Sequence, residues 1–134
     1  MLNDHPEARQ RLDEELVGWL TTVSSEGQPQ ASAVWHTVDD GNIVVYSGAK
    51  ATRLQNIASN SRVAYNLRGD TQGDHVTTIE GTVLIDPDFV GAADNAAYVA
   101  KYETEMRRLG WTPEQFEALF PVVLRIKVAR VRSS

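Results

Sequence analysis

The sequence contains no cysteine, which excludes disulfides, thiolate nucleophiles and cysteine-based metal sites together. No apolar run approaches the roughly 18 residues of a membrane-spanning helix. The histidines His5, His36 and His75 are scattered, without the spacing of a metal-binding helix face. We therefore expect no metal site, no membrane contact and a cytoplasmic location.

The signatures of common nucleotide-binding folds and hydrolases are also missing. The chain has no dinucleotide glycine fingerprint, no phosphate-loop lysine motif and no Gly-x-Ser-x-Gly elbow. The adjacent carboxylates of Asp39 and Asp40 precede Gly41, and a turn explains them better than acid–base catalysis does. No side chain is an obvious catalytic group, so any reactivity is expected to come from a bound cofactor.

Acidic residues are missing from one long segment. Between Gly41 and Gly69 there are four cations, Lys50, Arg53, Arg62 and Arg68, and no acid, so this segment carries +4 while the whole chain carries −5 and the remainder −9. A nucleic-acid binder usually shows a broad basic face. A small basic region on an acidic chain favours a small anionic ligand instead.

The length and the hydrophobic pattern indicate one small β-rich domain over residues 1–134. A chain of 134 residues buries a modest share of its surface, so pairing with a second copy is expected. The predicted class is mainly β with flanking helices (α+β), a six-stranded antiparallel barrel closed by the C-terminal strand. The predicted strands are 17–23, 30–38, 43–47, 62–66, 76–85 and 122–131, and the predicted helices are 6–15, 50–59, 96–109 and a short helix after the capping box at Thr112.

The segment from Ser47 to Arg53 joins a predicted strand to a predicted helix. Free amide hydrogens and the helix dipole favour an anion at such a junction. Lys50 and Arg53 in the first turn are disfavoured by roughly 0.3–1 kcal/mol each unless an anion binds there. Helical periodicity places both on the apolar side, facing inward. The alternative is a surface helix whose cations extend into water; we favour the anion site.

Several motifs, taken in order, resemble the split β-barrel family of pyridoxamine 5'-phosphate oxidase-like proteins. Among these, the chain looks most like the B-type coenzyme F420 (deazaflavin)-dependent oxidoreductases of actinobacteria. The similar segments include Trp19-Leu20-Thr21-Thr22-Val23, Ala33-Val34-Trp35, Val44-Val45-Tyr46-Ser47, residues 50–57, Arg62-Val63-Ala64, Glu80-Gly81-Thr82-Val83, Asp86-Pro87-Asp88 and Thr112-Pro113-Glu114-Gln115-Phe116.

The resemblance implies a FMN-binding-barrel-like fold and a homodimer with coenzyme F420 at its interface, acting on a small-molecule substrate. It places the second strand along the cofactor ring and the strand-to-helix junction at the phosphate. Trp35 is expected to be a wall on the substrate side rather than a core residue. The implied cofactor-binding residues are Ser32, Ala33, Val34, Trp35, Tyr46, Ser47, Lys50, Thr52 and Arg53.

The leading functional hypothesis is an oxidoreductase that transfers a hydride from reduced F420 to an unsaturated small molecule. A second hypothesis keeps the fold and binds FMN, as a pyridoxamine 5'-phosphate oxidase-like protein, with Arg125, Lys127 and Arg130 available for a second phosphate. A barrel that binds single-stranded nucleic acid through Trp35 and Tyr46 is opposed by the acidic remainder. A non-catalytic cofactor-binding module is the last alternative. The substrate, and the choice between F420 and FMN, stay open.

Overall fold

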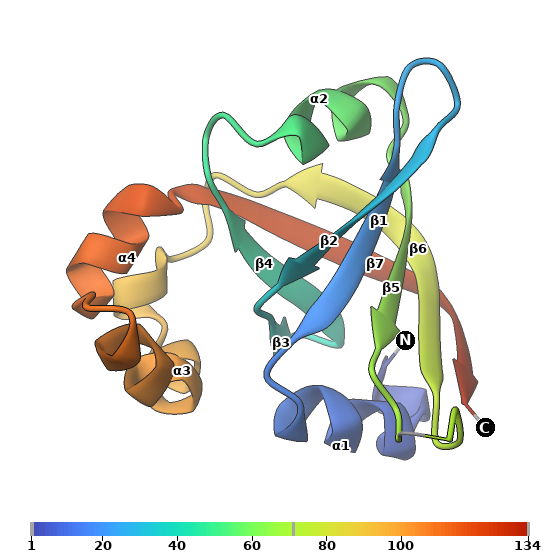
Figure 1. The fold of residues 1–134 in the computed structure, drawn as a ribbon, viewed down its shortest axis with the longest axis horizontal. Helices are drawn as coiled ribbons and strands as arrows, with labels where there is room; N and C mark the ends of the chain where they lie inside the picture. The colour runs from blue at the N-terminus through green and yellow to red at the C-terminus, as the bar shows by residue number, and fades with distance from the viewer. Residues whose placement is uncertain (1, 71, 134) are drawn as a thin grey trace.

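The structure, a computed structural model, describes residues 2–70 and 72–133. Its described residues form a seven-stranded antiparallel sheet that curls into a split barrel (Figure 1). The mainly β class with flanking helices is therefore confirmed. The strands are β1 (Gly18–Val23), β2 (Pro29–Val34), β3 (Thr37–Asp39), β4 (Asn42–Ser47), β5 (Arg62–Leu67), β6 (Thr77–Ile85) and β7 (Val122–Ser133).

The helices cover two ends and one side of the barrel (Figure 1). The first helix, α1, lies at one end, α2 at the other, and α3 and α4 together beside β4. No helix in the described ranges is long and apolar enough to cross a membrane. The helices are α1 (Pro6–Glu14), α2 (Thr52–Ser59), α3 (Ala96–Arg108) and α4 (Pro113–Leu119), with short 3-10 turns at Leu2–Asp4 and Ala92–Asp94.

The predicted single strand 30–38 is two strands, so the expected count of six is wrong. The sheet order is β2-β1-β5-β6-β7-β4-β3, which puts β2 and β3 at its two ends although only Trp35 and His36 separate them in sequence. The backbone N–H of His36 donates to the Tyr102 hydroxyl at 2.9 Å, and this hydroxyl lies 2.7 Å from the Leu16 carbonyl, to which it donates. Because a side chain of α3 takes the place of a neighbouring strand, the β ladder stops here.

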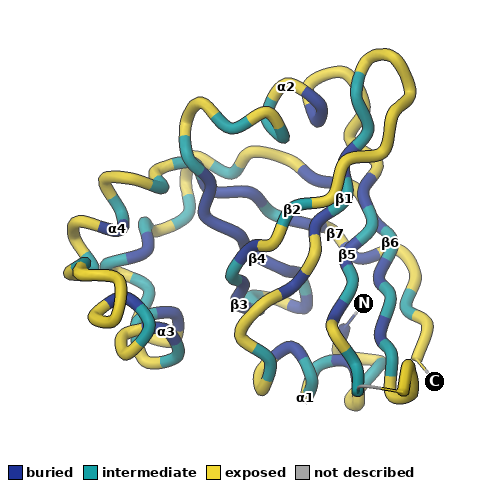
Figure 2. The backbone as a smooth tube through the Cα atoms, viewed as in Figure 1, coloured by how far each residue is buried: buried dark blue, intermediate teal, exposed yellow. Residues whose placement is uncertain are grey.

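Two apolar clusters stabilise the fold. Leu20, Ile79 and Ile126 are among the buried side chains inside the barrel, whereas Tyr98 and Tyr102 belong to an aromatic cluster between β4, β7 and the α3–α4 pair. Figure 2 shows β4 as one of the most continuously buried segments, because it contacts both clusters. The aromatic residues of 96–109 therefore pack against the sheet.

Gly81 marks a β-bulge. The register of β6 on β7 shifts between Glu80 and Gly81. A Cβ atom at position 81 would lie 2.2 Å from the Lys127 carbonyl oxygen, so only glycine lets the two backbones approach this closely.

The charged residues of β7 differ in their exposure. The side chain of Arg125 is only 12% exposed, and its guanidinium pairs with Asp39 at 2.9 Å and with Asp86 at 3.0 Å. These two ion pairs tie β7 to β3 and to the end of β6. Lys127 and Arg130 are exposed, as expected for a solvated strand face.

His36 is fully buried and bonded through both ring nitrogens. Its Nε2 lies 2.8 Å from the Leu12 carbonyl and donates to it, so Nδ1 accepts from the Tyr65 hydroxyl. Lys101 also donates to the Leu12 carbonyl, which belongs to the last turn of α1. Burial, helped by the charge of Lys101, lowers the pKa of His36 to about 3.

We expect acid to destabilise the fold through His36. Its folded pKa of about 3 lies below the ordinary value of 6.5, so between these values only the unfolded chain binds this proton. This contribution to stability is complete above pH 6.5 and falls by roughly 1.4 kcal/mol per pH unit as pH decreases toward 3. Urea unfolding from pH 7 to pH 4 measures it. His36→Gln should give a shallower slope and His75→Gln, at an exposed position, the wild-type slope; equal slopes in all three proteins would contradict the assignment.

Candidate functional site

Arg53 extends from the first turn of α2 into the gap between β2 and β4. Its Nη1 donates to the Ser47 hydroxyl at 3.0 Å and its Nη2 to the Ser32 hydroxyl at 3.2 Å. None of the ion pairs among the described residues includes Arg53. Burial lowers its pKa, but a guanidinium stays charged in proteins. The result is a half-buried cation held by two neutral hydroxyls.

The structure brings Ser32, Ser47 and Arg53 together and leaves Lys50 and Thr52 at the surface. The helix begins at Thr52, and Lys50 precedes it in an exposed turn. The expectation that Lys50 faces inward is therefore wrong, because helical periodicity does not extend to a residue outside the helix. Ala51 at the N-cap provides no side-chain cap for the first amides of α2.

The predicted ring-binding residues lie on a strand with one unpaired edge. β2 pairs with β1 on one side and is terminal in the sheet on the other. Ala33 is exposed, Val34 is buried, and Trp35 lies just past the strand end. A flat molecule can therefore approach the β2 backbone past a side chain no larger than a methyl group.

A cavity of ≈ 230 Å³ lies beside this strand, between the barrel and the α3–α4 pair. Arg53 is its only charged lining residue, and Ala33 and Val34 also line it. The cavity has an apolar, largely aromatic wall beside a single cation, an arrangement suited to a planar ligand with an anionic group. The aromatic lining residues are Trp35, Tyr46, Tyr98, Trp111, Phe116 and Phe120.

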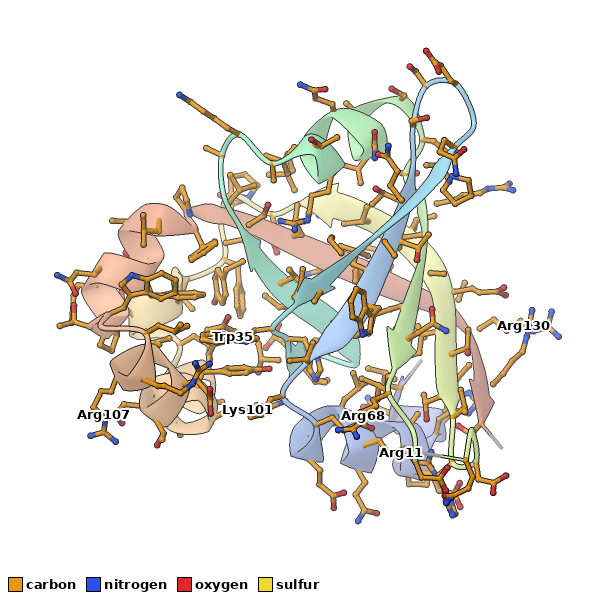
Figure 3. The ribbon with its side chains drawn as sticks, viewed as in Figure 1. Arg11, Trp35, Arg68, Lys101, Arg107 and Arg130 are labelled. Atoms are coloured by element: carbon orange, nitrogen blue, oxygen red, sulfur yellow. The ribbon has the colours of Figure 1, made fainter. Side chains whose placement is uncertain are left out.

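Trp35 lines this cavity and also packs between helices (Figure 3). Its ring stacks on Tyr102 with centroids 4.7 Å apart and on Phe116 at 5.4 Å, nearly parallel to both. The two roles weighed from the sequence, cavity wall and packing residue, thus coexist in one half-buried side chain.

The Tyr46 hydroxyl is held away from any reaction by its own hydrogen bonds. It donates to the Val90 carbonyl at 3.0 Å and accepts from the Asn95 amide at 3.1 Å. Burial raises the pKa of Tyr46, so the hydroxyl keeps its proton. Tyr46 therefore contributes ring surface to the cavity and fixes the segment before α3.

Sequence reasoning missed Asn56, which positions α2. Its buried amide donates to the Thr22 hydroxyl and to the Gln30 side chain, both at 2.9 Å, which ties the helix to β1 and β2. The available signal was its place three residues after Arg53, on the same helix face.

Tyr98 is a second residue that the sequence did not mark as part of the site. It lines the cavity, is fully buried, and its hydroxyl has no hydrogen-bond partner among the described residues. Burial raises its pKa far above the usual value, so the unpaired group is a neutral hydroxyl. Within the described ranges, no group of His, Asp or Glu side chains is arranged to hold a metal ion.

The fold agrees with the comparisons to known proteins. The sequence matches the pyridoxamine 5'-phosphate oxidase family over residues 4–134, and the chain belongs to that family. No curated protein shows significant sequence similarity to it.

Three solved structures illustrate the breadth of the fold. The conserved hypothetical protein Rv2991 from Mycobacterium tuberculosis is 25% identical, with a TM-score of 0.72 over 96% of this chain and 82% of that one. An F420 reductase is 22% identical, with a TM-score of 0.68 over 92% and 94%. HutZ, the heme storage protein from Vibrio cholerae, is 16% identical, with a TM-score of 0.65 over 96% and 93%. Identities this low show shared architecture and leave the ligand open.

We expect Tyr98→Phe to leave stability unchanged or to raise it, because it removes a buried hydroxyl without a partner. Tyr102→Phe is the matched control, since it removes a hydroxyl bonded to Leu16 and His36 and should cost about 1–2 kcal/mol. Thermal unfolding of both variants measures the difference. Equal losses in the two variants would show that the Tyr98 hydroxyl has a partner after all.

Proposed function

We propose that this protein binds a deazaflavin, coenzyme F420, and transfers a hydride from its reduced form to an unsaturated small molecule in the cytoplasm. The narrower assignment to the B-type F420-dependent oxidoreductases of actinobacteria belongs to the same proposal. Membership in the pyridoxamine 5'-phosphate oxidase family and likeness to an F420 reductase support a flavin-type ligand.

The observation that carries the proposal is the guanidinium of Arg53. This half-buried cation has no carboxylate partner among the described residues, and two of its five N–H donors remain free beside a cavity with aromatic walls. A ligand phosphate would pair with Arg53 next to the hydroxyls of Ser32 and Ser47. The exposed Lys50 and Thr52 would contribute at the rim.

The proposed chemistry needs orientation more than acid–base groups. The reduced cofactor supplies the hydride, and this chain's residues hold the reactants in place. Ala33 and Val34 would lie along the ring, and Trp35 would separate the ring from solvent on the α3–α4 side. We assign no proton donor, because the tyrosine hydroxyls nearest the cavity keep their protons through burial.

Two other functions within the family are an FMN-binding oxidase and a non-catalytic cofactor carrier. An FMN-binding oxidase would also use Arg53, but its expected second phosphate cannot use Arg125, which is committed to Asp39 and Asp86. Lys127 and Arg130 remain exposed and available. The same cavity would also serve a protein that binds a cofactor without catalysis. The likeness to a heme storage protein supports this alternative.

Arg53→Ala should weaken F420 binding by roughly 1.5–3 kcal/mol, the range of a charge-assisted hydrogen bond to a buried anion. Fluorescence titration of the purified protein with F420, and separately with FMN, measures the loss and identifies the preferred cofactor. Lys50→Ala is the control cation, with an expected loss below about 0.5 kcal/mol because it is exposed. Unchanged affinity in Arg53→Ala, in a protein that melts normally, would refute the phosphate assignment.

We also propose that two copies pair with the cofactor between them. A cleft of ≈ 550 Å³ on β1, β5 and β6 is lined partly by small side chains such as Thr21 and Ala64, which would let a second sheet approach, and it also contains the charged Arg62 and Glu80. Sedimentation of the wild-type protein should show a dimer. The substitution Thr82→Arg, in this cleft, should dissociate it into monomers. Thr104→Arg on the exposed side of α3 should leave the dimer intact. A stable monomer with full cofactor affinity would contradict this proposal.

A further inference from the structure

A second and larger groove lies at the α1 end of the barrel. It encloses ≈ 690 Å³ between α1, the start of β1 and the loop after β5. Trp19 is 48% exposed there, and Leu16 and Val17 are each 38% exposed. Large apolar side chains gathered at one exposed place are typical of a binding surface.

Two arginines face this apolar surface without ion-pair partners. The Nη2 of Arg11 lies 3.1 Å from the His75 ring, and its Nη1 is buried with no hydrogen-bond partner among the described residues. Arg68 is exposed, and neither guanidinium belongs to an ion pair within the part of the chain that the structure describes. Arg11 belongs to α1, and Figure 3 shows Arg68 at the same end of the molecule.

The carboxylates of the groove already have other donors. Glu15 accepts from the backbone N–H of Arg68 at 3.0 Å. Asp70 accepts from the backbone of Gln72 at 3.0 Å and of Asp74 at 2.8 Å, within its own loop. The groove is lined by two arginines and two carboxylates, and within the described residues neither arginine forms an ion pair with either carboxylate.

We propose that this groove binds a planar aromatic carboxylate, with its ring against Trp19 and its anionic group between Arg11 and Arg68. The indole face supplies stacking area, and two guanidinia match the geometry of a carboxylate. The exposed guanidinium of Arg68 supplies the donors that such a ligand reaches directly, and Arg11 adds its positive charge from the wall of the groove.

This site is separate from the aromatic cavity beside α2 and does not depend on the cofactor proposal. Trp19 and Ala33 are cross-strand partners on β1 and β2, so the two sites are neighbours along the sheet. The lining residues differ, however, and each site has its own cations, Arg53 in one and Arg11 with Arg68 in the other. A ligand in the groove can therefore be tested without any cofactor.

The test compares 2-naphthoate with its neutral analogue 2-naphthamide by isothermal titration calorimetry of the full chain. The carboxylate should bind roughly 10-fold more tightly than the amide, and high salt should remove most of that preference. Arg68→Gln and Arg11→Gln should each lower naphthoate affinity several-fold and leave naphthamide binding unchanged. Trp19→Leu should weaken both ligands alike.

Two control variants make the result specific. Arg107→Gln removes an exposed arginine of α3 whose partner is Glu103, so it should bind naphthoate as the wild type does. Arg53→Gln should do the same, because its cation belongs to the other cavity.

A loss of binding confined to Arg53→Gln, no preference for the carboxylate, or competition between naphthoate and dimerisation would overturn the proposal. If Arg11→Gln disturbs α1, Arg68→Gln decides alone, because only its backbone supports the fold.

Discussion

The geometry of this molecule depends on the hydrogen bonds that interrupt one strand at His36. Tyr102 takes the backbone N–H of His36, while the ring of His36 is fixed between Leu12 and Tyr65. The interruption separates β2 from β3, which stand at the two ends of the sheet. Trp35 lies at this break, where it stacks on Tyr102 of α3 and Phe116 of α4 and lines the aromatic cavity. The sheet lacks a ladder hydrogen bond at His36, and the candidate site lies next to this break.

The same interruption shows how far the sequence alone can lead. Local patterns located nearly every helix and strand, the capping box at Thr112 and the bulge at Gly81, since propensity, periodicity and turn residues act over a few positions. The break at His36 depends on Tyr102, 66 positions away, and no local pattern encodes that contact. For the same reason the inward orientation of Arg53 was predictable from helical spacing, whereas the exposure of Lys50 depends on the residue at which the helix begins.

The arginines separate structural from candidate functional charges. Arg125 has two carboxylates and is a tie between strands, whereas Arg53, Arg11 and Arg68 have none in the described ranges. Removing a guanidinium from water is unfavourable unless acceptors replace the lost hydration. The hydroxyls of Ser32 and Ser47 at Arg53, and the ring of His75 at Arg11, accept only some of the guanidinium hydrogens. The remaining donors are the basis of the two proposed anion sites. Membership in the pyridoxamine 5'-phosphate oxidase family establishes the scaffold, and the family alone does not specify the ligand.

The two end strands of the sheet are consecutive in sequence, joined only by Trp35 and His36. These two residues therefore hold the end of β2 close to the start of β3. At this point the two strands cannot move far apart, because the three Cα–Cα steps from Val34 to Thr37 span at most about 11 Å, and the backbone N–H of His36 cannot pair with another strand while it is bonded to Tyr102. The connection thus limits the separation of β2 and β3 at this end of the two strands before any ligand binds.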